Sequence, residues 1–316
     1  MSDKDIAIMK KHPMPINLQK WINHFGTANR LNRTEPDWEA PLNLPEKKRR
    51  ALAMTLAEYQ LGDGGGPCRL IASDAEALRA TDEEVRIVID LWFREEAEHS
   101  RLLGGAVRRL NGTFLTDSFG FRWFNRCRLA IGAQFEMLML LIVEIVSTAY
   151  YQSIRRHCDD EPIARMCRLI LRDEAGHVQF HRERLMSLHP DGVSKGWRAG
   201  FLLLGYACTS FLWLGHGPWL REIGVTRGEL FGSVQKGFAR FLKHLKTGLR
   251  ALPTGTRRGT RQTSPATMKG RGVISLSFPP HPPRRRVGVG DEFRAFAHFS
   301  FRRVPISNRS PFSKKK

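Results

Sequence analysis

A glutamate followed three residues later by a histidine occurs twice in the chain, in closely similar surroundings. The pairs are Glu96 with His99 and Glu174 with His177, and both stretches read acid-Glu-Ala-x-His. A single Glu-x-x-His arises often by chance, whereas two copies inside apolar helical patterns restrict the fold strongly. Three residues turn an α-helix by about 300°, so the two side chains of each pair project from the same face.

The second pair lies on a helix face that is expected to be buried, because Ile170, Leu171 and Val178 share that face. A carboxylate and an imidazole on a buried face destabilise a fold unless a partner compensates them. A metal ion compensates both groups at once. The doubled motif therefore predicts a metal site to which both pairs contribute.

Hydrophobic periodicity predicts an all-α fold, with capping signals at several of the helix starts. Thr81–Glu84 forms a capping-box pattern, and acidic residues with Pro162 begin the fourth helix. The expected helices cover residues 46–61, 82–110, 121–157, 159–188, 194–223 and 227–252, with a short helical turn at 74–80.

The chain divides into four regions by composition. Prolines interrupt the N-terminal arm, in which Trp21, Ile22 and Phe25 are expected to anchor the arm to the domain. The tail is rich in Arg, Pro, Gly and Ser and has no periodicity, which is typical of disorder. The regions are an arm at 1–46, a four-helix domain at 47–190, additional helices at 191–252 and a disordered basic tail at 253–316.

The third predicted helix is apolar on nearly every side between residues 135 and 151, so it should be buried on every side. Glu144 in this stretch has no ready route to water, and an isolated buried carboxylate takes up a proton or needs a positive partner. Glu136 lies eight residues earlier, about 80° around the helix, and is the competing candidate. In the first helix, Glu58 shares a small apolar face and is expected to point inward. The alternative is an exposed glutamate near the helix end.

Residues 50–188 resemble the ferritin-like superfamily of non-haem di-iron carboxylate proteins, in which two helices each give a glutamate and two others each give Glu-x-x-His. Glu144 followed seven residues later by Tyr151, and then Glu174 with His177, is similar to the pattern of rubrerythrin-like members. The resemblance implies a ferritin-like four-helix bundle with additional C-terminal helices. It implies that the metal ligands are Glu58, Glu96, His99, Glu144, Glu174 and His177.

The acid before Glu174 also resembles the fourth helix of soluble acyl-carrier-protein desaturases. By that resemblance Asp173 orients His99, and Glu95 orients His177, from outside the set of ligands. In the first half the pattern departs, because Gly65 stands seven residues after the first ligand where a tyrosine is usual.

Three further positions near the expected ligands are informative. Ile170 stands where arylamine oxygenases of the superfamily carry an extra histidine, so that activity is not expected here. Tyr151 is expected to hydrogen-bond a ligand carboxylate, with a redox-active tyrosine as the alternative. His181 lies one turn beyond His177, and is either next to the site or a partly exposed helix histidine.

Four carboxylates and two imidazoles form a ligand set that suits iron or manganese. We therefore expect two Fe ions as the cofactor, with a Mn/Fe pair or a Mn2 pair as alternatives. Such a pair would use O2 or peroxide, so we expect an oxidoreductase with an unidentified organic substrate and an external electron donor. The alternatives are an iron-handling or peroxide-scavenging rubrerythrin-like protein without an organic substrate, and a metal-stabilised non-enzyme that associates with membranes or nucleic acids.

The net charge of +20 is unevenly distributed along the chain. Residues 221–316 hold 22 Lys and Arg against 4 Asp and Glu, so the remainder of the chain is close to neutral. The charge therefore gives no reason to assign nucleic-acid binding to the helical domain. Five cysteines without a Cys-x-x-Cys pair favour a reduced, cytoplasmic setting over a disulfide framework.

Gly200–Leu220 has no Lys, Arg, Asp or Glu and reaches the length of a transmembrane helix. Its glycines and Pro218 favour a buried helix or a contact within an oligomer such as a homodimer, with membrane insertion as the alternative. The last predicted helix has one basic face, so it either docks on the domain or lies on an anionic membrane surface. A weak peripheral membrane contact through residues 200–250 is therefore a further expectation.

Overall fold

The computed structural model describes residues 16–28, 33–63, 81–131 and 133–251 of the 316-residue chain. Within these residues there are eight α-helices and no strands, which confirms the all-α prediction. The expected turn at 74–80 and the tail at 253–316 lie outside the described residues. The helices are α2 (Leu18–Ala28), α3 (Glu46–Asp63), α5 (Asp82–Arg109), α6 (Phe119–Ile131), α7 (Ala133–His157), α8 (Glu161–Leu188), α9 (Lys195–Ile223) and α10 (Arg227–Ala251).

Polar side chains cap the starts of the two helices that carry the Glu-x-x-His motifs. Thr81 accepts a hydrogen bond from the backbone N–H of Glu84, and the Glu84 side chain accepts one from the backbone N–H of Thr81. Asp160 accepts a hydrogen bond from the backbone N–H of Ile163 at the start of α8. Pro162 lies in the first turn, where its missing N–H leaves no helical bond unmade. Both starts agree with the sequence signals.

The expectation of one helix over residues 121–157 is wrong, because the structure has two helices, α6 and α7, on either side of residue 132. The sequence has Gly132 at this point, and glycine is the weakest helix former after proline. α6 packs against α7 and also reaches α3. The apolar helix at the centre of the protein is therefore shorter than the hydrophobic pattern suggests.

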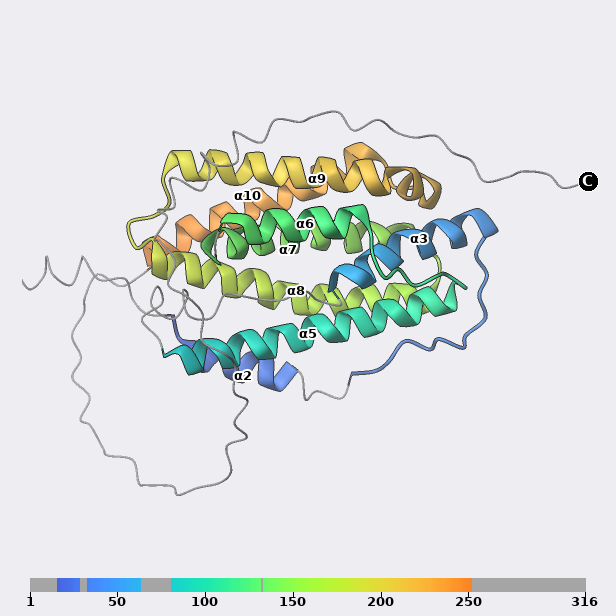
Figure 1. Cartoon of the computed structure of the whole chain (residues 1–316), viewed down its shortest axis with the longest axis horizontal. Coiled ribbons are helices and arrows are strands. Elements are labelled where there is room, and N and C mark those ends of the chain that lie inside the picture. The colour runs from blue at the N-terminus through green and yellow to red at the C-terminus, as the bar shows by residue number, and fades with distance from the viewer. Residues whose placement is uncertain (1–15, 29–32, 64–80, 132, 252–316) are drawn as a thin grey trace, which may run out of the picture.

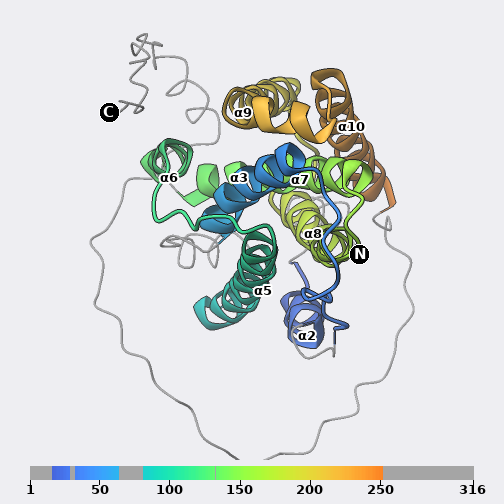
Figure 2. The same cartoon turned by 90° about the vertical axis from the view of Figure 1, so that its right-hand side faces the viewer.

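The helices form layers on both sides of α7 and α8 (Figures 1 and 2). α3 packs on α5, α7 packs on α8, and the two pairs meet where α5 contacts α8. α9 covers α3 and α7, α10 covers α7 and α8, and α2 lies against α5 on the opposite side (Figure 2). α7 thus has neighbours on several sides, as expected of a helix that is apolar all round.

α2 anchors the N-terminal arm as the sequence predicts. Trp21 and Phe25 are fully buried in a small hydrophobic core with Trp92 of α5 and Phe180 of α8. The indole N–H of Trp21 also donates a hydrogen bond to Oε2 of Glu183, at 2.9 Å. A larger core joins α3, α5, α7, α8, α9 and α10. Phe25 and Trp92 of the smaller core contact the ring of the motif residue His177.

Of the described helices, α7 and α9 are long and apolar enough to cross a membrane by length and composition alone. The most apolar stretch of α7 is 78% buried inside the protein, against 28% for that of α9. α9 packs one side on the other helices and exposes Leu203 and Leu214, at 67% and 79% of their surface. The helix that contains Gly200–Leu220 is thus buried along one side and exposed along the other. A membrane contact, a homodimer contact and a cytoplasmic location all stay predictions.

Two glycines of α9 provide a matched test of how closely α9 packs on α10. A β-carbon at Gly205 would overlap the ring of Phe238, whereas one at Gly215 would meet nothing within 4 Å. We expect Gly205→Ala to lower the free energy of unfolding by about 1–3 kcal/mol, because the ring has to move. Gly215→Ala should raise it by up to about 1 kcal/mol, because alanine is the better helix former. Urea denaturation measures both, and equal effects would contradict the packing.

Candidate metal centre

Carboxylates and imidazoles from α3, α5, α7 and α8 converge in two overlapping groups. Asp63, Glu96 and His99 form one group, and Glu96, Glu144 and His177 form the other. In each group the potential ligand atoms all lie within 4.8 Å of one another. Glu96 belongs to both groups, so its two oxygens connect two adjacent sites of three residues each.

Glu174 lies between the two groups. Its Oε1 is 3.8 Å from Nδ1 of His99, and its Oε2 is 3.4 Å from Nδ1 of His177. Glu96 is placed in the same way, with Oε2 3.5 Å from Nδ1 of His99 and Oε1 3.1 Å from Nδ1 of His177. Two carboxylates therefore each face both histidines, an arrangement suited to bridging two metal ions.

Several buried ligand atoms have no hydrogen-bond partner among the described residues. They are Nδ1 of His99, Nδ1 of His177 and Oε2 of Glu174, whose contacts with one another and with Glu96 are close but lack the geometry of a hydrogen bond. Both histidines are fully buried, so water does not replace the missing partner from the surface. A buried polar atom without a partner costs roughly 1–3 kcal/mol. These atoms point at the same small region, so the residues fit a group that accepts electron pairs from all of them, as a metal ion does.

The opposite ring nitrogens of the two histidines are held by carboxylates. Nε2 of His99 is 3.3 Å from Oδ2 of Asp173, and Nε2 of His177 is 3.0 Å from Oε2 of Glu95. A carboxylate at Nε2 places the ring proton there and leaves Nδ1 as an electron-pair donor. These are the two contacts that the resemblance to desaturases implies.

Arg33 lies between the two orienting carboxylates, a role that no motif in the sequence indicates. Its guanidinium is 2.5 Å from Oδ2 of Asp173 and 4.0 Å from Oε1 of Glu95, and its side chain is 8% exposed. Burial raises the pKa of Asp173, but His99 and Arg33 outweigh burial and hold that pKa below its ordinary value. His99 and Arg33 together therefore favour the charged form of Asp173, which is the stronger acceptor for His99.

The expectation that Glu58 lies with the other ligands is wrong. Its Oε2 is 2.9 Å from Nε2 of His216 on α9, and its side chain is 38% exposed. Asp63, at the end of α3, takes the corresponding place in the first group. Five residues separate the two acids, which is about 140° around the helix, so they cannot face the same region. Asp63 lies beyond the end of the helix expected over residues 46–61, so helical spacing did not indicate it.

Tyr151 supports the assignment of Asp63. Its hydroxyl donates a hydrogen bond to Oδ2 of Asp63, at 3.2 Å. Burial and the neighbouring Glu96 raise the pKa of Asp63 to about 8. Of the two roles expected for this tyrosine, the structure therefore contains the hydrogen bond to a candidate ligand carboxylate.

Glu136 and His181 are buried but belong to neither group. Glu136 is 2% exposed in the first turn of α7, whereas Glu144, further along α7, reaches His177 with Oε1 at 3.7 Å from Nδ1. His181 is 1% exposed and stacks edge-on against Trp92, so the alternative of a partly exposed helix histidine is wrong. Burial, with Arg184 as the second cause, holds the pKa of His181 well below its ordinary value.

The acids of the two groups raise the pKa of both histidines. Burial lowers the pKa of His177, but Glu144 and Glu96 outweigh burial and raise that pKa well above its ordinary value. Burial also opposes protonation of His99, whose pKa is raised by Asp173 and Glu96. Burial raises the pKa of Glu174, and Glu144 raises it further. A metal ion that binds these groups would therefore have to displace protons from them.

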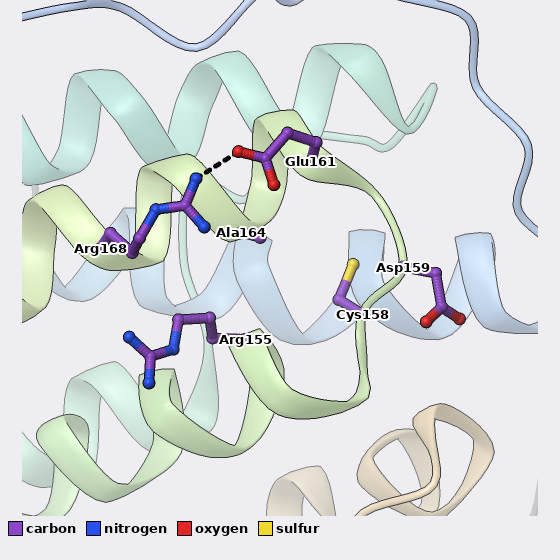
Figure 3. Close-up of a pocket in the computed structure, with 6 residues that line it drawn as sticks. All are labelled: Arg155, Cys158, Asp159, Glu161, Ala164 and Arg168. Atoms are coloured by element: carbon purple, nitrogen blue, oxygen red, sulfur yellow. Dashed lines mark hydrogen bonds and ion pairs between the residues drawn. The ribbon is translucent and has the colours of Figure 1, made fainter.

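A second hollow, of about 410 Å³, lies where α7 is joined to α8 (Figure 3). Arg155, Cys158 and Asp159 line it, and Arg168 is paired with Glu161 across its edge. Glu161 is 13 residues before Glu174 on the same helix, or about 20 Å along its axis. The hollow is therefore separate from the metal candidates and adds no ligand to them.

Comparison with known proteins adds no relative, since no family model, no curated protein and no solved structure matches the chain.

Two substitutions on α3 separate the candidate ligand set suggested by the structure, with Asp63, from the one expected from the sequence, with Glu58. We expect Asp63→Asn to weaken binding of one of two metal ions by roughly 100-fold, because loss of a ligand exceeds the effect of losing an outer partner. Glu58→Gln should leave the metal content unchanged. Elemental analysis of both purified variants tests this. Loss of metal in Glu58→Gln, with retention in Asp63→Asn, would restore the sequence-based assignment.

Metal binding should depend on pH, because the ligand atoms have to lose their protons. The pKa values of His99, His177 and Glu174 are raised, and that of Asp63 is about 8. Lowering the pH below about 8 therefore keeps protons on the ligands, and affinity should fall about tenfold per pH unit for each proton displaced. Calorimetric titration with Mn(II) in buffers of different ionisation enthalpy counts the released protons. Binding without proton release would contradict the geometry.

Proposed function

We propose that this protein is a ferritin-like di-metal oxidoreductase that uses O2 or peroxide to oxidise an organic substrate. The observation that carries the proposal is the pair of ligand groups that share Glu96, with partnerless Nδ1 atoms of His99 and His177 facing them. The contributions come from four helices in the order expected for a ferritin-like four-helix bundle, with Asp63 in place of Glu58.

The charge of the candidate ligands fits two divalent cations. Asp63, Glu96, Glu144 and Glu174 provide four carboxylates, which together balance two ions of charge +2. Oxygen and imidazole ligands suit iron and manganese, so the proposed cofactor is two Fe ions, or a Mn/Fe or Mn2 pair. Such a pair supplies two electrons to O2 or peroxide when it is bound.

The protein residues hold this centre in a fixed geometry. Asp63, Glu96 and His99 would hold one ion, and Glu144 and His177 with Glu96 the other. Outside them, Tyr151 fixes Asp63 and the indole N–H of Trp92 donates to Oε1 of Glu96 at 3.0 Å. These hydrogen bonds restrict the carboxylates to the orientations that face the metal positions.

The proposed reaction needs protection of the metal centre from water and a source of electrons. Both candidate ligand histidines are 0% exposed, so bulk water has no direct access to them. Exclusion of water protects reactive species from side reactions. The sequence has no Cys-x-x-Cys pair of the kind that a rubredoxin module uses, so the proposal includes an external electron donor.

A matched pair on α7 tests the function. Apo protein is loaded anaerobically with Fe(II) and then mixed with O2 or hydrogen peroxide. We expect two Fe per chain and consumption of the oxidant together with Fe(II) oxidation in the wild type and in Glu136→Gln. Glu144→Gln, which removes a ligand charge at nearly constant size, should slow this by roughly 100-fold or more. Circular dichroism checks that both variants fold.

The other outcomes favour different functions. Uptake of many Fe ions per chain with mineral formation would support an iron-handling protein. Rapid turnover of peroxide without any effect of organic compounds would support a peroxide scavenger. Two tightly bound metal ions that consume neither O2 nor peroxide would contradict the proposal and leave a metal-stabilised non-enzyme.

A further inference from the structure

A cavity of about 240 Å³ lies between α7, α8 and the start of α9. Its walls are mainly apolar: Met137, Leu138 and Leu141 come from α7, and Leu185 and Leu188 come from α8. Trp197, in the first turn of α9, completes the apolar lining. An apolar cavity with a few polar groups is the usual form of a site for a small organic ligand.

The polar part of the lining is cationic or neutral. Gln134, His181, Arg184 and His189 contribute to it, and none of the described residues that line the cavity is acidic. Nε2 of His181 is buried and has no hydrogen-bond partner among the described residues. Arg184 is 2% exposed, and its guanidinium donates a hydrogen bond to Oε1 of Gln134 at 2.7 Å. Nε2 of His181 and the guanidinium of Arg184 make this end of the cavity suitable for a negative, oxygen-bearing group of a ligand.

The polar end of the cavity adjoins the candidate metal centre. His181 follows His177 by one turn of α8, so both project toward the same side of that helix. The ring of Trp92 contacts both histidines, with centroid distances of 5.1 Å to His181 and 5.5 Å to His177. Trp92 also donates its hydrogen bond to Glu96. A single indole ring and one helical turn therefore separate the cavity from the candidate ligands.

We propose that this cavity binds a small amphiphilic carboxylate, with its carboxylate at Arg184 and His181 and its apolar body along α7 and α8. The planar guanidinium of arginine matches a carboxylate, and a neutral His181 with its ring proton on Nε2 can donate a hydrogen bond to it. The volume is below the roughly 300–1,000 Å³ typical of drug-sized ligands, which limits the body to a single ring or a chain of about eight carbons. That this ligand is the substrate rests on the proposed function, whereas its binding does not require a metal ion.

The test uses purified full-length protein and three probes of the same length: octanoate, octanol and octylammonium. We expect saturable binding of octanoate by calorimetry, at least tenfold tighter than binding of either other probe. Arg184→Met should abolish this preference, and Arg182→Met, which changes an arginine of α8 outside the cavity lining, should retain it. A photoreactive octanoate analogue should label peptides from 134–141 and 181–189 in the wild type, which locates the site even if Arg184→Met does not fold.

The results separate this inference from the proposed function. Equal binding of the three probes, absence of saturable octanoate binding, or labelling confined to other peptides would each overturn the inference. Oxidant consumption by the Fe-loaded protein is measured on the same preparations. Octanoate binding without oxidant consumption would leave the cavity assignment standing and contradict the oxidoreductase, and the reverse result would contradict only the cavity.

Discussion

The fold depends on how two fully buried imidazoles are compensated. Each ring has one nitrogen fixed by a carboxylate, while the other nitrogen faces a set of carboxylates without a hydrogen-bond partner. In a protein without a bound cation, this arrangement combines unsatisfied polar atoms with mutually repelling acids, and both destabilise a helical core. A pair of divalent cations would remove both penalties, so we infer that the core of α5, α7 and α8 is organised around metal binding.

Residues around the candidate ligands hold these side chains in defined orientations. The guanidinium of Arg33 lies next to the carboxylates of Asp173 and Glu95. These carboxylates in turn hold Nε2 of His99 and Nε2 of His177. Tyr151 donates a hydrogen bond to Asp63, and Trp92 donates one to Glu96. α9 and α10 pack on α7, and α2 packs on α5, where its Phe25 contacts the ring of His177. Helix packing thus brings the carboxylates and imidazoles together, and their charges favour a cation as the bound species.

Residues in regular helices were predictable because helical spacing fixes which side chains share a face. The doubled Glu-x-x-His and the isolated Glu144 in an apolar stretch are signals of this kind, and the structure brings their side chains together. Asp63 and Arg33 gave no such signal. Asp63 lies at the end of α3 beside a glycine-rich stretch, and Arg33 lies in a non-helical segment, so periodicity says nothing about either. Glu58 was assigned to the site because its neighbours on α3 are apolar. Its actual partner, His216 on α9, is distant in sequence and could not be recognised from local spacing.

The most direct test of the central claim is a crystallographic anomalous difference map of the Fe(II)-loaded protein. We expect two peaks about 3.5–4 Å apart, between Glu96 and Glu174, with Asp63 and His99 next to one peak and Glu144 and His177 next to the other. A single peak, or no peak among these residues, would contradict the proposal that the helices are organised around a pair of metal ions.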